Sequence, residues 1–335
     1  MFGSDFRLHT TPPPRSRGAI GPCAAAWRQG VALTLHAFIL LTVIFSPATA
    51  SASRRVHSNH KASVSPPSFG QLDGLRATAD PAGLQSSVAL VVDADTNEVL
   101  LSKNSQAVLP IASLTKLMTA LVVTEAHQPS DEMLTVSEAD VDTLKHSSSR
   151  LAVGTQLTRG EMLHLALMAS ENRAAHALAR NYPGGLDACI AAMNAKAAEL
   201  GMSDTHYIDP TGLSSQNQSS ARNLALLVEE ANKHETIREL STSDNYLVAI
   251  GKKLMRFHST NTLVRSHLWE ISLQKTGYIT EAGRCMVMRA RMAGHQLVMV
   301  LLDAAASGAR VHDAERVRSW VAQTYAQRAA AQAPR

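Results

Sequence analysis

The sequence predicts an α+β fold, in which an antiparallel sheet flanked by helices carries an inserted all-helical subdomain. Strand patterns occur near both ends of the folded part, and a long stretch of mostly helical pattern separates them. Short polar turns join neighbouring strand patterns, which is typical of antiparallel hairpins. With 335 residues, of which 45% are hydrophobic, the chain is long enough to bury a sizeable core.

Residues 1–50 have the features of a signal peptide. Arginines come first, an apolar run follows at 31–45, and Ala48-Thr49-Ala50 offers a small-residue cleavage site. The alternative is an uncleaved membrane anchor, but the apolar run is short for a span and Ser, Pro and Ala follow it. We therefore expect an exported, periplasmic protein, with cleavage after Ala50 or Ala52 left open.

Residues 51–83 are expected to be a flexible linker, because their first part is rich in Ser and contains a Pro-Pro pair. An α/β subdomain is expected at 84–127 and 262–327. It begins with the hairpin "SSVALVVDADTNEVLLS", and its later strand patterns are "WEISLQKTGYI", "GRCMVMRARM" and "HQLVMVLLDA". A closing helix at about 312–327 and a frayed tail at 328–335 complete the chain.

Residues 128–261 are expected to form the helical subdomain. Thr158 and Glu161 have capping-box spacing and start one helix. A second helix, "ENRAAHALARNYPGG", stops at Pro-Gly-Gly, and apolar residues at 4-3-4-3 spacing between 186 and 200 predict a third. A cleft between the two subdomains is the natural place for a binding site.

Composition and charge exclude several classes of function. The net charge is +4, but without residues 1–50 the chain carries 28 basic and 27 acidic residues, and aromatics are only 4%. These values do not suit a nucleic-acid-binding protein.

The 14 histidines show no metal-ligand spacing, so no metal or other cofactor is expected. Cys189 and Cys285 remain in the mature chain; two separate buried thiols are favoured over a disulfide, with pairing left open.

The stretch "PIASLTKLMTA", residues 110–120, places a hydroxyl and an amine three residues apart in an otherwise apolar helix. At that spacing Ser113 and Lys116 share a helix face, about 5–6 Å apart. Burial lowers the pKa of a lysine, and a neutral amine can remove the serine proton. Such a pair can act as nucleophile and base, although S-x-x-K alone also fits a helix cap and a surface lysine.

Two further motifs strengthen the catalytic interpretation. "SEN", Ser170 to Asn172, falls at the junction of two predicted helices, where a loop can present side chains to a cleft. "KTG", Lys275 to Gly277, lies in a predicted strand near a sheet edge. Its lysine supplies a positive charge for a carboxylate, Thr276 adds a hydroxyl, and Gly277 lets a substrate backbone approach. Either motif alone is equally compatible with capping or with a solvated strand end.

With these three motifs the sequence resembles the serine penicillin-recognising enzymes, whose signature is S-x-x-K, S-x-N and K-T-G. Within them it is similar to the low-molecular-mass penicillin-binding proteins of the D-alanyl-D-alanine peptidase family, in its D-alanyl-D-alanine endopeptidase branch. The segments "LALMASENRAAHALARNYPGG", "MNAKAAELGMSDTHYIDPTGLS" and "KTGYITEAGRCMVMRA" carry the resemblance. It covers roughly 85–325 and implies the transpeptidase fold of penicillin-binding proteins and β-lactamases.

The resemblance implies catalytic roles for four residues. Ser113 attacks the carbonyl of a D-alanyl peptide bond and forms an acyl-enzyme, and Lys116 is its general base. Ser170 relays a proton to the leaving amine. Asn172 orients Lys116 and the substrate amide. A nearby Lys275 is expected to depress the pKa of Lys116 further.

It also implies four substrate-binding residues. Lys275 and Thr276 hold the substrate carboxylate, and Gly277 lets the substrate lie along the strand. The backbone N–H groups of Ser113 and Tyr278 form the oxyanion hole. The partners implied are peptidoglycan stem peptides and cross-links, with β-lactams as covalent inhibitors.

The resemblance leaves several activities to be distinguished. A D,D-endopeptidase, soluble or loosely held at a membrane, is favoured because the chain stops soon after the last predicted helix. The alternative is a D,D-carboxypeptidase that uses the same residues. A class A β-lactamase is less favoured, because "DPTGL" at 209–213 lacks the deacylating glutamate and the asparagine that should follow it. A non-catalytic wall-binding protein is less favoured because all the motifs are intact.

Overall fold

The computed structural model describes residues 66–266 and 268–332, which belong to one compact unit. The predicted signal peptide at 1–50 and the linker residues 51–65 lie outside the described ranges. Within those ranges, none of the helices has the length and hydropathy that crossing a bilayer requires.

A five-stranded antiparallel sheet joins the two ends of the chain, in the order β2-β1-β11-β10-β9. Its strands are β1 (Val88–Asp93), β2 (Val99–Lys103), β9 (Glu270–Ile279), β10 (Gly283–Met292) and β11 (His295–Ala304). The early and late strands meet where β1 pairs with β11, with Leu90 opposite Val300. The predicted α+β class with an antiparallel sheet is confirmed.

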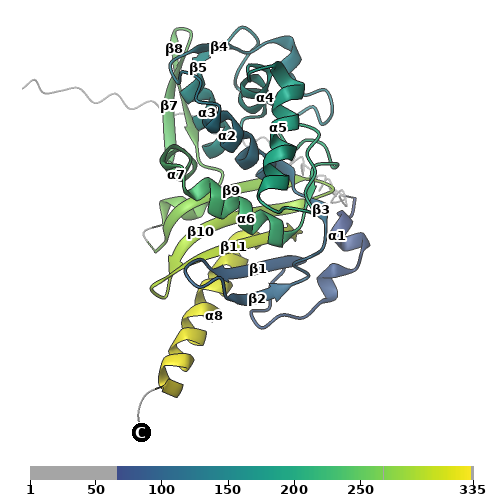
Figure 1. The fold of residues 1–335 in the computed structure, drawn as a ribbon, viewed down its shortest axis with the longest axis vertical. Coiled ribbons are helices and arrows are strands. Elements are labelled where there is room, and N and C mark those ends of the chain that lie inside the picture. Colours follow the sequence, from purple (N-terminus) through teal and green to yellow (C-terminus); the bar gives the residue numbers. More distant parts are fainter. Residues whose placement is uncertain (1–65, 267, 333–335) are drawn as a thin grey trace, which may run out of the picture. The chain divides into compact units, whose positions relative to one another are not determined.

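Helices cover both faces of this sheet, because alternate side chains of each strand point to opposite faces. On one face Val91 and Met299 belong to the same apolar cluster as Val317 of α8 (Ala309–Gln332). On the other face Leu90 and Val300 belong to a larger cluster. That cluster includes α6 (Ala221–Asn232) and the helices above it (Figure 1).

The helix α2 (Thr115–Glu125) is central in the helical part of the molecule, as its sequence predicts. Nine of its eleven residues are buried. Around it lie α3 (Arg159–Met168), α4 (Asn172–Arg180), α5 (Gly185–Glu199) and α6, whereas α7 (Glu235–Thr242) packs against α3 and β9 (Figure 1). The predicted capping box is present: Thr158 and Glu161 exchange hydrogen bonds at the start of α3. Cys189 and Cys285 are free and buried, as expected.

The range predicted to be all-helical differs from the prediction in two ways. It contains a hairpin, β7 (Asn245–Ile250) with β8 (Lys253–His258), which buries Val248 and Phe257. In addition α6 packs on the sheet, not only among the helices. Short pairings, β3 (Leu109–Pro110) with β6 (Gln218–Ser219) and β4 (Met133–Thr135) with β5 (Gln156–Thr158), also occur.

The predicted boundaries at both ends of the folded part are also revised. Residues 66–83 were expected to be linker but contain α1 (Phe69–Leu72) and the 3₁₀ turn η1 (Leu75–Ala77). Several contacts hold this segment, among them a hydrogen bond from Phe69 N–H to Glu281 O at 3.0 Å and the pairing of Lys103 with Asp80 at 3.1 Å. At the other end α8 continues to Gln332, so residues 328–332 of the predicted tail are helical.

Candidate active site

Ser113 and Lys116 lie at the start of α2, within reach of each other. Ser113 is on the 3₁₀ turn η2 (Ala112–Leu114), and Lys116 Nζ lies 2.8 Å from Ser113 Oγ. The turn is tight: Ala112 has a φ of 50°, a conformation that non-glycine residues seldom adopt. Gly212 makes this turn possible, because a Cβ there would lie 1.8 Å from Ala112 O.

The Lys116 amine has two other neighbours, and both can only accept. Its Nζ lies 2.7 Å from Asn172 Oδ1 and 2.7 Å from Thr211 O. A neutral amine has two protons and one lone pair, so these acceptors take both protons. The lone pair is then left facing Ser113 Oγ, which is the arrangement that removal of the serine proton requires.

The protonation state of Lys116 suits this role. Its side chain is fully buried, and burial lowers its pKa to about 7. The carboxylates of Asp209, Glu171 and Asp142 oppose this shift without cancelling it. The neutral form of Lys116 is therefore accessible near pH 7, far below the pH at which an ordinary lysine loses its proton.

Lys275 was expected to depress the pKa of Lys116, but the structure assigns the stronger effect to Lys275 itself. Lys275, on β9, is fully buried, and its pKa lies well below the usual lysine value. Burial is the main cause, followed by the charges of Lys116 and Arg310. Lys116 owes its own shift to burial.

The second motif connects the two lysines. Ser170 lies between α3 and α4, with a φ of 59°, and its Oγ accepts a hydrogen bond from Lys275 Nζ at 2.9 Å. Asn172 is the first residue of α4 and contacts Lys116. The junction of two helices predicted for this motif is confirmed. Ser170 and Asn172 thus each contact one of the two buried amines.

Gly277 brings β9 against the serine turn. A Cβ at this position would lie 2.9 Å from Ser113 N and 3.1 Å from Ile111 O, so no larger residue fits without backbone movement. On either side of it, Thr276 Oγ1 lies 2.6 Å from Thr260 Oγ1, and the Tyr278 side chain is 47% exposed. Every residue that the sequence predicts for the site therefore lies on or beside η2, the α3–α4 junction or β9.

Comparison with known proteins identifies the family. A family profile described as D-alanyl-D-alanine carboxypeptidase, the S11 peptidases, matches residues 76–306. The chain belongs to this family. The D-alanyl-D-alanine endopeptidase of Pseudomonas aeruginosa is 44% identical over 240 residues, 71% of this chain and 77% of the relative. The enzyme of the same name from Escherichia coli is 42% identical over 246 residues, 73% and 79% of the two chains.

A solved structure of a DD-transpeptidase supports the fold. The crystal structure of the Streptomyces K15 DD-transpeptidase matches with a TM-score of 0.67 and 26% identity. The match covers 72% of this chain and 98% of that one. The predicted fold of penicillin-binding proteins is confirmed, and this S11 peptidase is a serine hydrolase by family.

Some residues of the site were not predicted from the sequence. Arg310 of α8 donates to Gly277 O at 3.2 Å and adds a guanidinium group near Lys275. Thr211 contributes its backbone carbonyl to Lys116, and Thr260 contacts Thr276. No local motif marks these positions. Each of them lies far along the chain from the residue that it contacts, and a motif describes only neighbouring residues.

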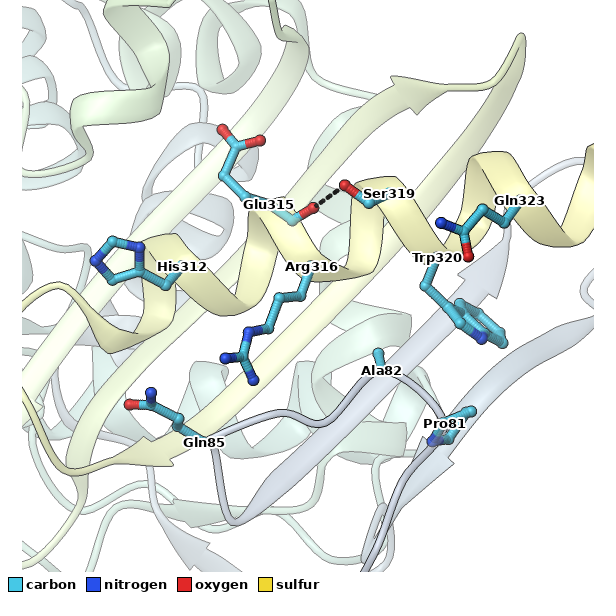
Figure 2. A pocket seen from close by; sticks show the side chains of 9 residues that line it. All are labelled: Pro81, Ala82, Gln85, His312, Glu315, Arg316, Ser319, Trp320 and Gln323. Atoms are coloured by element: carbon cyan, nitrogen blue, oxygen red, sulfur yellow. Dashed lines mark hydrogen bonds between the residues drawn. The ribbon is translucent and has the colours of Figure 1, made fainter.

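One pocket of the described part of the chain reaches the site. A pocket of about 420 Å³ has Asn172 in its wall, together with Asp142, Leu144, His176 and Leu213. Figure 2 shows another, of about 490 Å³, between residues 81–85 and α8, which shares no residue with the site.

A possible cation-binding group lies apart from the site residues. Glu125, Glu230 and His234 offer ligand atoms within 4.8 Å of one another. Glu125 already pairs with Lys196 at 2.9 Å, so a cation there would compete with the ammonium group.

Proposed function

We propose that this S11 peptidase is a serine D,D-endopeptidase that hydrolyses D-alanyl cross-links in peptidoglycan through an acyl-enzyme. The observation that carries the proposal is the environment of Lys116. Two acceptor-only groups bind its amine, and its third neighbour is Ser113 Oγ. This arrangement supports the roles of Ser113 as nucleophile and Lys116 as base.

The reaction uses the contacts of the resting site. Ser113 Oγ attacks the D-alanyl carbonyl carbon while its proton passes to Lys116 Nζ. The backbone N–H groups of Ser113 and Tyr278 stabilise the developing oxyanion. Ser170, which contacts Lys275 at 2.9 Å, relays the proton held by Lys116 to the leaving amine as the C–N bond breaks, so that Lys116 is neutral and Ser170 protonated again. Water then gives a proton to Lys116 as its oxygen attacks the ester carbonyl, and that proton returns to Ser113 Oγ as the C–O bond breaks.

The part of the substrate that leaves as the amine, here called the leaving peptide, is proposed to lie along β9. That strand pairs with β10 on one side only, and the serine turn packs against Gly277. Lys275, Thr276 and Arg310 hold the acidic end of the leaving peptide. A bound carboxylate raises the pKa of the buried Lys275 and so restores its charge.

The nucleophile is tested with a fluorescent penicillin. The wild-type protein is expected to be labelled covalently, and Ser113→Ala to abolish labelling without changing the melting temperature by more than a few degrees. Mass spectrometry of the labelled mature protein locates the adduct and the N-terminus. Labelling that persists in the Ser113→Ala variant contradicts the proposal.

A D,D-carboxypeptidase is the second candidate, because the profile that matches the chain carries that description. Purified muropeptides separate the two activities. Loss of cross-linked dimers supports the endopeptidase, whereas loss of terminal D-alanine from pentapeptide stems alone supports the carboxypeptidase. The relatives at 42–44% identity are both named endopeptidases, which favours the first outcome.

The location follows from the substrate and from the predicted signal peptide. We propose an exported, periplasmic enzyme, soluble or loosely held at a membrane, that meets peptidoglycan outside the inner membrane. Fractionation of cells that express the full chain tests this location. Recovery in the cytoplasmic fraction at full length would contradict it.

A further inference from the structure

The segment 142–150, here called the serine loop, contacts two residues of the second motif. Asn172 Nδ2 donates to Ser147 Oγ at 2.8 Å, and Ser149 Oγ donates to Glu171 at 2.7 Å. The middle serine, Ser148, is exposed. Ser147 and Ser149 therefore bind the two residues that follow Ser170 in the motif.

The Ser147 contact favours one orientation of the Asn172 amide. The Ser147 hydroxyl hydrogen-bonds the Asp142 carboxylate, which can only accept, so the Ser147 oxygen is left to accept from Asn172. An asparagine side chain can turn over and exchange its oxygen with its nitrogen. With Nδ2 on Ser147, Oδ1 faces Lys116, where it accepts one amine proton. In the reversed orientation Nδ2 would donate to the lone pair of Lys116, and that lone pair would no longer be available to Ser113.

The serine loop is itself held at several points. The Asp142 carboxylate accepts from the backbone N–H groups of Leu144, Lys145 and Ser147 at 2.8 to 2.9 Å. Lys145 Nζ lies 2.5 Å from Glu281, which is in the turn between β9 and β10. The loop that supports Asn172 is thus tied to the sheet that carries Lys275.

The other end of the loop has a separate anchor. The Arg150 guanidinium lies over the ring of Phe257, 3.6 Å from its centroid, and donates to Arg256 O at 2.8 Å. These contacts fix the loop to the β7–β8 hairpin. Because the β9–β10 turn holds one end of the serine loop and the β7–β8 hairpin holds the other, the position of Ser147 is well fixed.

We propose that the serine loop is a positioning device for the catalytic base. Ser147 sets the orientation of Asn172 and through it the lone pair of Lys116, and the Lys145–Glu281 ion pair locks the loop against the sheet. Ser147 and Lys145 are positioning residues, since neither contacts Ser113. The proposal rests on the proposed function, in which Lys116 is the base.

The test compares Ser147→Ala, Ser147→Thr and Ser148→Ala by the rate of acylation with fluorescent penicillin from pH 5.5 to 9. Ser147→Ala is expected to lower the plateau rate about tenfold, the effect of one lost hydrogen bond. Its acid-limb midpoint is expected to move to lower pH, because an amide N–H facing Lys116 disfavours the ammonium form. Ser147→Thr, which keeps the hydroxyl, restores both values, and Ser148→Ala matches the wild type.

General destabilisation would lower the labelled fraction but would not move the midpoint. If Ser147→Ala shows the wild-type rate and midpoint, or if Ser148→Ala shows the same change, the positioning role is overturned. The Ser113→Ala variant is labelled in a separate experiment. If it is still labelled, the proposed nucleophile is wrong; if only the Ser147 variants fail to behave as expected, the positioning role alone is wrong.

The ion pair is tested by exchanging its charges. Lys145→Glu and Glu281→Lys are each expected to slow acylation several-fold, and the double exchange to restore most of the rate. Exposed ion pairs contribute little to stability, so the melting temperatures of all three variants should stay close to the wild type. Single variants that slow acylation without recovery in the double exchange overturn the locking role.

Discussion

At the scale of single residues, the unusual feature is a fully buried lysine that has no carboxylate within ion-pair distance among the described residues. Burial of Lys116 favours its neutral form and lowers its pKa to about 7. Unfolding is therefore coupled to proton uptake by Lys116, since the pKa of a lysine in an unfolded chain is near 10.5. The property that makes Lys116 a base therefore also makes stability depend on pH.

Lys116→Met is predicted to remove this part of the pH dependence. Between pH 7 and 10 the unfolded wild-type chain binds one more proton than the folded chain at this site, so raising the pH stabilises the wild type. From pH 7.5 to 9.5 the difference in the free energy of unfolding should shift by about 2–3 kcal/mol in favour of the wild type. Denaturant titrations of both proteins at several pH values measure it. Parallel curves would show that Lys116 is already charged in the fold.

The same titration should appear in catalysis. Acylation of Ser113 by penicillin is expected to rise with pH through about 7, as Lys116 loses its proton, and then to level off. Stopped-flow labelling at a series of pH values gives the profile. A rate that is flat from pH 5.5 to 8.5 would argue for a different base.

At the scale of elements, the segment before β1 is attached to the sheet by a buried ion pair. The side chains of Asp80 and Lys103 are only 3% and 2% exposed. Asp80 also caps the backbone N–H groups of Ala82 and Leu84, so it links the segment to β2 and closes a local turn. These contacts explain why residues 66–83 are folded although their composition indicates a linker.

Asp80→Asn is predicted to destabilise the fold by about 3–5 kcal/mol, because it leaves the ammonium of Lys103 buried without a counter-charge. Glu98→Gln is the matched control, since the pair of Glu98 with Arg328 is about half exposed and its loss should change stability far less. Thermal or denaturant unfolding measures both. Equal effects of the two substitutions would mean that Lys103 reaches water when its partner is removed.

Other differences at this scale also have local causes. The β7–β8 hairpin was missed because its exposed positions, Leu247 and Leu254, are apolar, which hides the alternation that marks a half-buried strand. The hairpin β1–β2 was predicted because a polar turn separates two apolar runs. The capping box at Thr158 was predicted because its signal is contained in four residues.

At the scale of the whole molecule, one apolar cluster joins the sheet to the helical part. It includes Leu121 of α2 and Cys189 of α5 together with Val287 of β10 and Val300 of β11. A shared core favours cooperative unfolding of the two parts, even though the chain alternates between them.

The two buried thiols test this cooperativity. Cys189 lies in the helical part and Cys285 in the sheet, and burial raises the pKa of each to about 12. In a chain without residues 1–50, which removes Cys23, both are predicted to resist alkylation at pH 8 and to react at the same rate in mild denaturant. Peptide mass spectrometry after timed alkylation gives both rates. Much faster labelling of Cys189 would show that the helical part opens alone.

The sequence alone predicted the strands of the five-stranded sheet, the main helices and the eight candidate site residues. Each depends on a short pattern: alternation, a cap, or a motif of three or four residues. Only the tertiary structure decided the rest. That Lys116 faces two acceptors, that Arg310 joins Lys275, and that the serine loop supports Asn172 all depend on contacts between residues far apart in the chain. Short sequence patterns do not predict such contacts, because the packing of the whole core determines which distant residues meet.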